Sequence, residues 1–525
     1  MISVRRIIQG FAPASGGDAG TLASYVRSLA TSSWLWLGIT GMLTLVLYGP
    51  IFDDWFQKDD FFFLRAARFT NPIEYVREAI AFTGHERHEF LVDLMRDQDI
   101  ALPFLAYRPL YFLSLEGMYL TFGENPMGYH VVSVAVHLAN AYLVWRIATR
   151  LVPGRLGPHI AALIFALHPT YVETVAWISD IGTPLAIFTV LLSLLFFTKS
   201  LERDPPHIGW YVSSYYLFGA SVFFHQETIS WVAVFAAYFL LVTPRARSRM
   251  LKPETWAFLV PFLLLAGGSY ALQVWLLSDT PINAGTFHIG THMLTHFKNL
   301  SSLALFPDVH GSSTVHFIAF VSLLGAMAGL VVLAYLRKRT LKPPHAELFV
   351  IVWFLAALAP LLTPDGLLWS NLSSISRKLY VAGPPLAILL VMVGMAIADA
   401  MPRRMLPAVG SLAALLLIPV LILSIDRGTD TREQFAVTAQ RSERFIASLQ
   451  ETYPTLPQGS TLYVLNAPIE LQVFQFHLVS IVQSFYGKVD ARAISASEAD
   501  ARENAILSDF IVFRYMPPSP TAGEE

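Results

Sequence analysis

The chain has no cysteine among its 525 residues. This absence excludes disulfide bonds, thiolate metal sites and cysteine nucleophiles, although it does not identify a compartment. Charge is also scarce, because Asp, Glu, Lys and Arg together make up 14% of the sequence and the formal net charge is -2. The basic residues are spread over short loops and form no single patch, so the sequence predicts no binding of nucleic acid.

Apolar residues are abundant instead. Hydrophobic residues make up 54% of the chain and aromatic residues 13%, and the mean hydropathy is +0.51. This composition is too apolar for a soluble globule and is typical of a protein that uses lipid as its solvent. We therefore expect an all-α, polytopic integral membrane protein.

Long apolar runs predict about eleven transmembrane helices. They lie at 34–52, 127–149, 159–178, 182–200, 209–224, 228–243, 256–277, 314–336, 347–364, 379–399 and 406–424. Basic residues fall in alternate short loops together with the N-terminus, which predicts that these loops are cytoplasmic. The longer, less basic connections then face outward, and the first span is interpreted as a retained signal anchor.

This orientation requires that 107–122 does not cross the membrane. We interpret it as an amphipathic helix in the outer interface, because it is short and contains Arg108 and Glu116. If 107–122 crosses the membrane, every later loop lies on the opposite side of the membrane. The predicted organisation is a cytoplasmic N-terminal segment (1–33), a transmembrane domain (34–425) with a large outer loop (53–125), a small α/β outer domain (426–516) and a disordered tail (517–525). In the α/β domain we expect strands at 461–465 and 510–513 and a helix near 470–486.

Four carboxylates follow the first apolar run directly, at Asp53, Asp54, Asp59 and Asp60. Ionised carboxylates near the membrane are expensive, and proteins that keep them there usually use them. The functional hypothesis is the acid/base end of a membrane enzyme. The alternative is a solvated acidic rim.

Three motifs occur in a fixed order along the chain: YRPL at 107–110, HPTYVETVAWIS at 168–179 and SRKLY at 376–380. Together with the acidic pair, they resemble the membrane part of the transmembrane-and-tetratricopeptide-repeat O-mannosyltransferases and their bacterial relatives, within the GT-C glycosyltransferases. The resemblance covers about 50–400. It implies a GT-C-like bundle that transfers a sugar from a polyprenyl-phosphate carrier to a protein or glycolipid acceptor on the outer, extracytoplasmic face. A bacterial inner membrane or a plasma membrane is the expected location.

The chain departs from that family in three ways. It lacks the helical repeats, it has Ser376 where an acidic residue is common before the arginine, and it has FFHQET at 223–228 where relatives often show a Ser-Lys-Glu-Gln-like stretch. The acceptor can therefore differ.

Inverting sugar transfer needs a carboxylate to accept the proton of the acceptor hydroxyl and positive charge to stabilise the departing phosphate. We favour Asp59 and Asp60 as catalytic carboxylates, because the residues after them match the family pattern, and Asp54 is the second choice. Arg377 and Lys378 are predicted to bind the donor phosphate. Their alternative role is snorkelling at a helix end. Arg108 is a further candidate contact, or a structural partner for an aspartate.

Further polar residues at outer helix ends are candidates for lining the substrate cavity, against the alternative of a helix-end hydrogen-bond network. They are His168, Glu173, Asp180, His225, Glu227 and, from the third motif, Tyr380.

The sequence indicates no metal site and no required cofactor. The stretch His85-Glu86-Arg87-His88 lacks the HExxH spacing. His288, His292 and His296 would form a stripe on one helix face, which is more often an interface than a metal site. A divalent ion held by aspartates and a sugar phosphate stays possible.

Two other functions remain open. A secondary transporter would need ionisable residues near the membrane midplane and paired interrupted helices, which we do not recognise. A catalytically inactive scaffold related to GT-C enzymes is the second.

Overall fold

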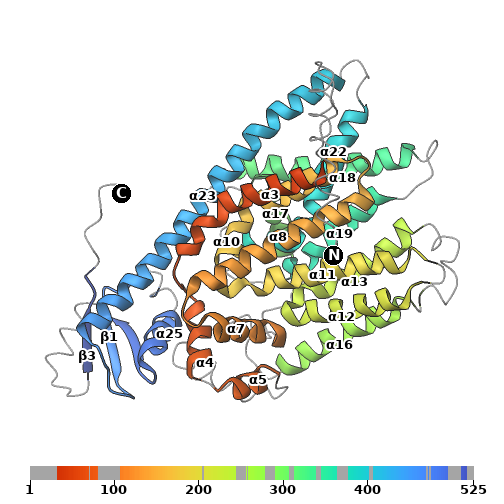
Figure 1. Ribbon diagram of the computed structural model, residues 1–525. Coiled ribbons are helices and arrows are strands. Elements are labelled where there is room, and N and C mark those ends of the chain that lie inside the picture. Colours follow the sequence, from red (N-terminus) through yellow and green to blue (C-terminus); the bar gives the residue numbers. More distant parts are fainter. Residues whose placement is uncertain are drawn as a thin grey trace, which may run out of the picture.

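The computed structural model describes residues 32–69, 71–80, 107–203, 206–243, 256, 258–277, 290–306, 312–337, 345–363, 376–400, 406–468, 471, 475–494 and 510–516. The protein is a bundle of helices that carries a small three-stranded sheet at one end (Figure 1). Residues 1–31 of the N-terminal segment, all of 81–106 and the predicted disordered tail lie outside the described residues.

Every predicted apolar run contains a helix. The main helices are α3 (Ser33–Tyr48), α8 (Pro126–Leu151), α9 (Leu156–Leu167), α11 (Gly182–Ser200), α12 (Ile208–Phe224), α13 (Val232–Ala237) continued by η5 (Tyr238–Val242), α16 (Val260–Leu277), α18 (Ser313–Arg337), α19 (Ala346–Leu362), α22 (Gly383–Ala400) and α23 (Leu406–Thr452). Within the described residues, five stretches are long and apolar enough to cross a membrane, and four shorter helices are also apolar. The chain is thus an integral multi-pass membrane protein, while the count of eleven spans stays a prediction.

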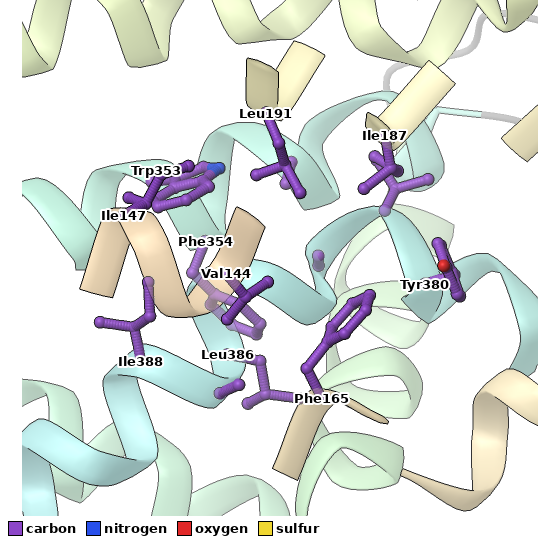
Figure 2. Packing of buried hydrophobic residues seen from close by; sticks show 14 of the residues in the cluster. Val144, Ile147, Phe165, Ile187, Leu191, Trp353, Phe354, Tyr380, Leu386 and Ile388 are labelled. Atoms are coloured by element: carbon purple, nitrogen blue, oxygen red, sulfur yellow. The ribbon is translucent and has the colours of Figure 1, made fainter. Parts of the chain in front are cut away.

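The central core lies where α8, α9, α11, α19 and α22 meet. Figure 2 shows Val144, Phe165, Leu191, Phe354 and Leu386 converging there from these five helices. All five side chains are buried. In lipid, helices do not associate through a hydrophobic driving force, so close packing of such side chains is what holds them together.

The sequence analysis predicted that Tyr380 lines the substrate cavity, but the residue belongs to this core. Its side chain is fully buried, and its hydroxyl accepts a hydrogen bond from Asn140 Nδ2 at 3.0 Å and lies 3.0 Å from His137 Nδ1. His137 Nε2 in turn lies 3.1 Å from the carbonyl oxygen of Ala166. The network ties α8, α9 and η7 (Arg377–Ala382) together, because buried polar groups must find partners inside the protein.

At one end of the bundle, short turns interrupt the helices. The predicted span 159–178 is broken: α9 ends at Leu167, since Pro169 cannot continue it. The chain then makes η2 (Pro169–Tyr171), α10 (Val172–Ala176) and η3 (Ile178–Asp180), and similar turns form η1 (Gly49–Asp53), η4 (Gln226–Trp231) and η7. Irregular backbone is tolerated in a membrane protein where it is buried in protein or lines a cavity.

Helix α23 is 47 residues long and runs through the predicted domain boundary at 425/426 without a break. At 1.5 Å per residue it extends roughly 70 Å, more than twice the ~30 Å hydrocarbon core of a bilayer. It therefore leads directly from the bundle to the sheet (Figure 1).

The C-terminal unit consists of β1 (Thr461–Leu465), β2 (Asp490–Ile494), β3 (Phe510–Arg514) and α25 (Gln475–Tyr486). The strands are parallel, in the order β2-β1-β3. β1 and β3 lie where strands were predicted, whereas β2 was missed because its Asp490 and Arg492 hide the apolar pattern.

This unit does not stand apart from the first loop. The buried side chains of α25, including Leu478 and Val482, form one cluster with Phe61 and Leu64 of α4 (Asp60–Phe69). α7 (Pro109–Phe122), the helix predicted at the interface, and α5 (Pro72–Ile80) pack beside α4, and α17 (His292–Leu305) packs against α18 and α19. The acidic loop is thus built into the contact between bundle and sheet.

Close packing at Gly383 gives a stability prediction. A Cβ at this position would lie 2.5 Å from Tyr171 Oη and 3.0 Å from Phe165 Cε2, both on fully buried rings. We expect Gly383→Ala to destabilise the protein by about 1–3 kcal/mol through overpacking, measured as a lower thermal midpoint in detergent. Gly394→Ala is the matched control on α22, because nothing lies within 4 Å of its Cβ position. Equal midpoints for the two variants would contradict the packing described.

Candidate functional site

Charged side chains from several separate segments gather at the end of the bundle where the helices are interrupted. Arg377 Nη1 lies 3.5 Å from Glu173 Oε1, which joins η7 to α10. Lys378 Nζ lies 3.4 Å from Glu227 Oε1, which joins η7 to η4. Arg108, just before α7, donates from Nε to Gln226 Oε1 at 2.6 Å. The name charged cluster is used below for the charged residues at this end of the bundle: Arg108, Glu173, Glu227, Arg377 and Lys378, together with Lys58, Asp59 and Asp180.

The contacts of Arg377 leave part of the hydrogen-bonding capacity of its guanidinium unfilled. Its Cζ lies 4.3 Å from the centre of the Trp177 ring, and its main-chain carbonyl accepts a hydrogen bond from Thr174. Its Nε is buried and has no hydrogen-bond partner among the described residues. A guanidinium in this state keeps donors for an additional anion.

Lys58 is a member of the cluster that the sequence analysis missed. Its backbone adopts a left-handed conformation (φ 50°), which is uncommon outside glycine. Its ammonium lies 5.0 Å from the centre of the Trp177 ring and 4.6 Å from that of Phe435. In the described part of the chain it forms no ion pair, and burial lowers the pKa of Lys58 while the charge of Glu173 opposes this.

The two favoured aspartates differ in their surroundings. Asp60 is buried, and its carboxylate accepts hydrogen bonds from the main-chain amide of Gln57 at 3.0 Å and from the amide (2.8 Å) and hydroxyl of Ser179. Burial raises the pKa of Asp60 to about 7, and the hydrogen bonds from Ser179 and Gln57 oppose the rise. Asp60 thus fastens the acidic loop to η3.

Asp59 is the more open carboxylate, with 37% of its side chain exposed. One oxygen, Oδ1, lies 2.8 Å from His477 Nε2 of α25. Asp59 directly follows Lys58, whose ammonium lies against the same Trp177 ring as the guanidinium of Arg377. The catalytic role of Asp59 stays a prediction, and nothing in the sequence pointed to His477 as its partner.

Asp54, the second choice, lies to one side. Its main-chain oxygen is 3.2 Å from His130 Nε2, and the charges that act on its carboxylate are those of Arg432 on α23 and of Asp53. The structure therefore places it next to α23 and not among the cations.

Glu173 pairs with Arg377 and Tyr380 lies in the core, and the other four predicted cavity residues divide into two groups. His168 has both ring nitrogens occupied, by Thr170 Oγ1 at 2.8 Å and by the carbonyl of Ala304 at 3.3 Å, which fits the helix-end network. In contrast, polar atoms of the second group are buried without a hydrogen-bond partner in the described residues. These atoms are Asp180 Oδ2, Glu227 Oε2 and both ring nitrogens of His225.

The histidine stripe has a structural contact. His292 Nε2 and His296 Nδ1 each lie 3.3 Å from a main-chain carbonyl at the end of α19, Thr363 and Leu362 respectively. His288 and the 85–88 stretch lie outside the described residues. Among those described, no group of three or more His, Asp or Glu side chains could hold a metal ion.

The geometry can be compared with known proteins. Residues 107–269 match the family model described as dolichyl-phosphate-mannose-protein mannosyltransferase. Protein O-mannosyl-transferase TMTC2 of Homo sapiens is 30% identical over 227 residues, which cover 39% of this chain and 27% of that protein. Tmtc1 of Drosophila melanogaster is 42% identical over 71 residues, which cover 14% and 8% respectively. The chain spans less than a third of these relatives.

A crystal structure of ArnT from Cupriavidus metallidurans bound to undecaprenyl phosphate aligns over 92% of this chain and 90% of that one, with 12% identity and a TM-score of 0.43. That likeness is too distant to say anything of substrates. The matches to the O-mannosyltransferases confirm the resemblance found in the motifs. The matched region, 107–269, contains Arg108, Glu173 and Glu227 but neither Asp59 nor Arg377.

The surroundings of Asp54 predict a pH dependence of stability. Burial raises its pKa from 3.8 to about 6, with Arg432 opposing the rise. Between these values the folded protein keeps a proton that the unfolded chain has lost, so the stabilisation is complete below about pH 4 and is lost as pH rises through about 6. We expect the thermal midpoint of the wild type to fall relative to Asp54→Asn over this interval. Asp53→Asn, at an exposed neighbour, should keep most of the wild-type trend, because burial of Asp54 is a larger cause of its raised pKa than the charge of Asp53. Parallel curves for wild type and Asp54→Asn would reject the prediction.

Proposed function

We propose that this protein is a membrane glycosyltransferase that moves a sugar from a polyprenyl-phosphate carrier to a hydroxyl of a protein or glycolipid acceptor on the outer face of the membrane. One observation carries the proposal: at the end of an apolar bundle an open carboxylate, Asp59, directly follows Lys58, whose ammonium lies against the same Trp177 ring as the guanidinium of Arg377. The mannosyl group is the first sugar to test, since it is the one named for the matching family.

The reaction we propose is a single displacement. The acceptor oxygen forms a bond to the anomeric carbon while the bond from that carbon to the phosphate oxygen breaks, and the acceptor proton passes to the carboxylate of Asp59. The polyprenyl phosphate departs with the electron pair of the broken bond. Positive charge fixed beside the phosphate stabilises the departing group most in the transition state.

The donor phosphate would lie against Arg377, Lys378 and Lys58, with Arg108 as a further contact. The pairs that hold two of these cations are long, 3.5 Å to Glu173 and 3.4 Å to Glu227. Charge-assisted hydrogen bonds at full strength measure about 2.7–2.9 Å. The carboxylates therefore compensate the cations without consuming them, and a phosphate can compete for the same donors.

The buried acceptor atoms next to these cations suit the sugar. Asp180 Oδ2 and Glu227 Oε2 have no hydrogen-bond partner among the described residues, although Glu227 Oε2 lies 3.6 Å from His225 Nδ1, and a neutral His225 offers one donor and one acceptor. Hydroxyl groups of a bound hexose can donate to such oxygens, which otherwise bear a desolvation cost. Glu173 and Asp180 also flank the turn that contains Trp177, so the same segment would contact sugar and phosphate.

No metal ion or cofactor is part of the proposal, and a divalent ion bound with the sugar phosphate would be an addition to it. The N-terminus would lie in the cytoplasm and the C-terminal unit outside. The charged cluster gathers at one end of the bundle, which favours a transferase over a secondary transporter with midplane sites.

The division of labour between the adjacent aspartates can be tested by transfer of label from polyprenyl-phosphate mannose in membranes. We expect Asp59→Asn to lower the rate by about a hundredfold or more, because the proton acceptor is lost. Asp60→Asn should lower the thermal midpoint as well as the rate, because one oxygen that accepts hydrogen bonds becomes a donor. Asp53→Asn is the matched control. Full transfer by Asp59→Asn would overturn the assignment of the base.

The phosphate site can be tested through the donor concentration dependence. Arg377→Gln should raise the donor KM about tenfold or more, the order expected for loss of a hydrogen bond to a charged group. Arg427→Gln serves as the control, since Arg427 pairs with Asp430 at 3.8 Å on an exposed face of α23. An unchanged donor KM in Arg377→Gln would remove Arg377 from the site.

A further inference from the structure

The C-terminal unit supplies a side chain to the charged cluster. His477 of α25 is buried, 4% exposed, and its Nε2 lies 2.8 Å from Asp59 Oδ1 although the two residues are 418 positions apart. We propose that His477 is a positioning residue, which holds the Asp59 carboxylate in the orientation needed to accept the acceptor's proton. This inference rests on the proposed function.

The contact is rigid because α25 is fastened to the acidic loop at several points. Ser484 Oγ donates to the carbonyl of Phe61 at 2.8 Å, and Arg68 Nη1 donates to the carbonyl of Ser484 at 3.0 Å. The rings of Trp55 and Phe485 stack with centres 6.0 Å apart. These contacts fix the distance between the helix that carries His477 and the loop that carries Asp59.

The pairing leaves one side of the carboxylate available. Oδ1 is occupied by the imidazole, while 37% of the Asp59 side chain remains exposed. A carboxylate with one oxygen anchored has a defined orientation for the other, and such orientation is worth large factors in rate. The C-terminal unit is therefore part of the active centre and not an appendage.

The test compares three variants on α25 in the mannosyl transfer assay. His477→Ala should lower kcat about ten- to hundredfold with little change in donor KM, because the base is misplaced while the phosphate site is intact. His477→Gln should recover most of this loss, since its amide can donate from nearly the same place as Nε2. Ser480→Ala is the matched control, because its hydroxyl is buried on α25 without a hydrogen-bond partner in the described residues.

Loss of docking must be separated from loss of positioning. Ser484→Ala removes the hydrogen bond to Phe61 but leaves the contact with Asp59 in place. We expect this variant to have a lower thermal midpoint and a kcat near that of the wild type. If Ser484→Ala matches His477→Ala in kcat, or if His477→Gln recovers nothing, the positioning role is overturned. If the wild type transfers the sugar and His477→Ala transfers it at the same rate, only the role of His477 is overturned. Absence of transfer by the wild type from every polyprenyl-phosphate sugar tried overturns the proposed function and this role with it.

Discussion

The structure depends on keeping charge compensated at the end of an apolar bundle. Four cations, Lys58, Arg108, Arg377 and Lys378, are held there with low solvent exposure, and isolated ions in such surroundings are very costly. Each is near a carboxylate or an aromatic face supplied by another segment. Because partners come from segments distant in sequence, the cluster forms only when the whole bundle has assembled.

Interrupted helices make this convergence geometrically possible. A continuous helix would carry Glu173 and Asp180 on nearly the same face but two turns apart, whereas the extended backbone at Trp177 between α10 and η3 changes the direction of the chain at the bundle end. The indole of Trp177 then serves both Lys58 and Arg377 as a partner. Beneath it, the network around Tyr380 fixes the start of α22 and hence the position of Arg377. Packing in the core thus sets the geometry of the charged residues.

Local sequence patterns predicted part of the fold and part of the candidate site. Hydrophobic runs located the helices, and two of the residues that the motifs singled out, Glu173 and Arg377, form an ion pair. Sequence reasoning failed where contacts are long-range. Nothing near His477 indicates a partner 418 positions away, and the aromatic setting of Lys58 depends on Phe435 from α23. Tyr380 was misplaced because a motif shows that a residue matters, not whether its side chain faces a cavity or the core. The continuity of α23 was missed because polarity changes along it while the helix does not.

The adjacent aspartates show how backbone geometry divides roles between identical side chains. Asp60 is the first residue of α4, and successive side chains at a helix start point about 100° apart. Asp60 is buried, whereas 37% of the Asp59 side chain, in the turn before the helix, is exposed. Asp60 meets the amide and hydroxyl of Ser179, so the loop is locked to η3, and Asp59 is left beside the cations with one oxygen held by His477. An acidic pair in this position provides both the anchor and the reactive group, and neither can replace the other without moving the helix.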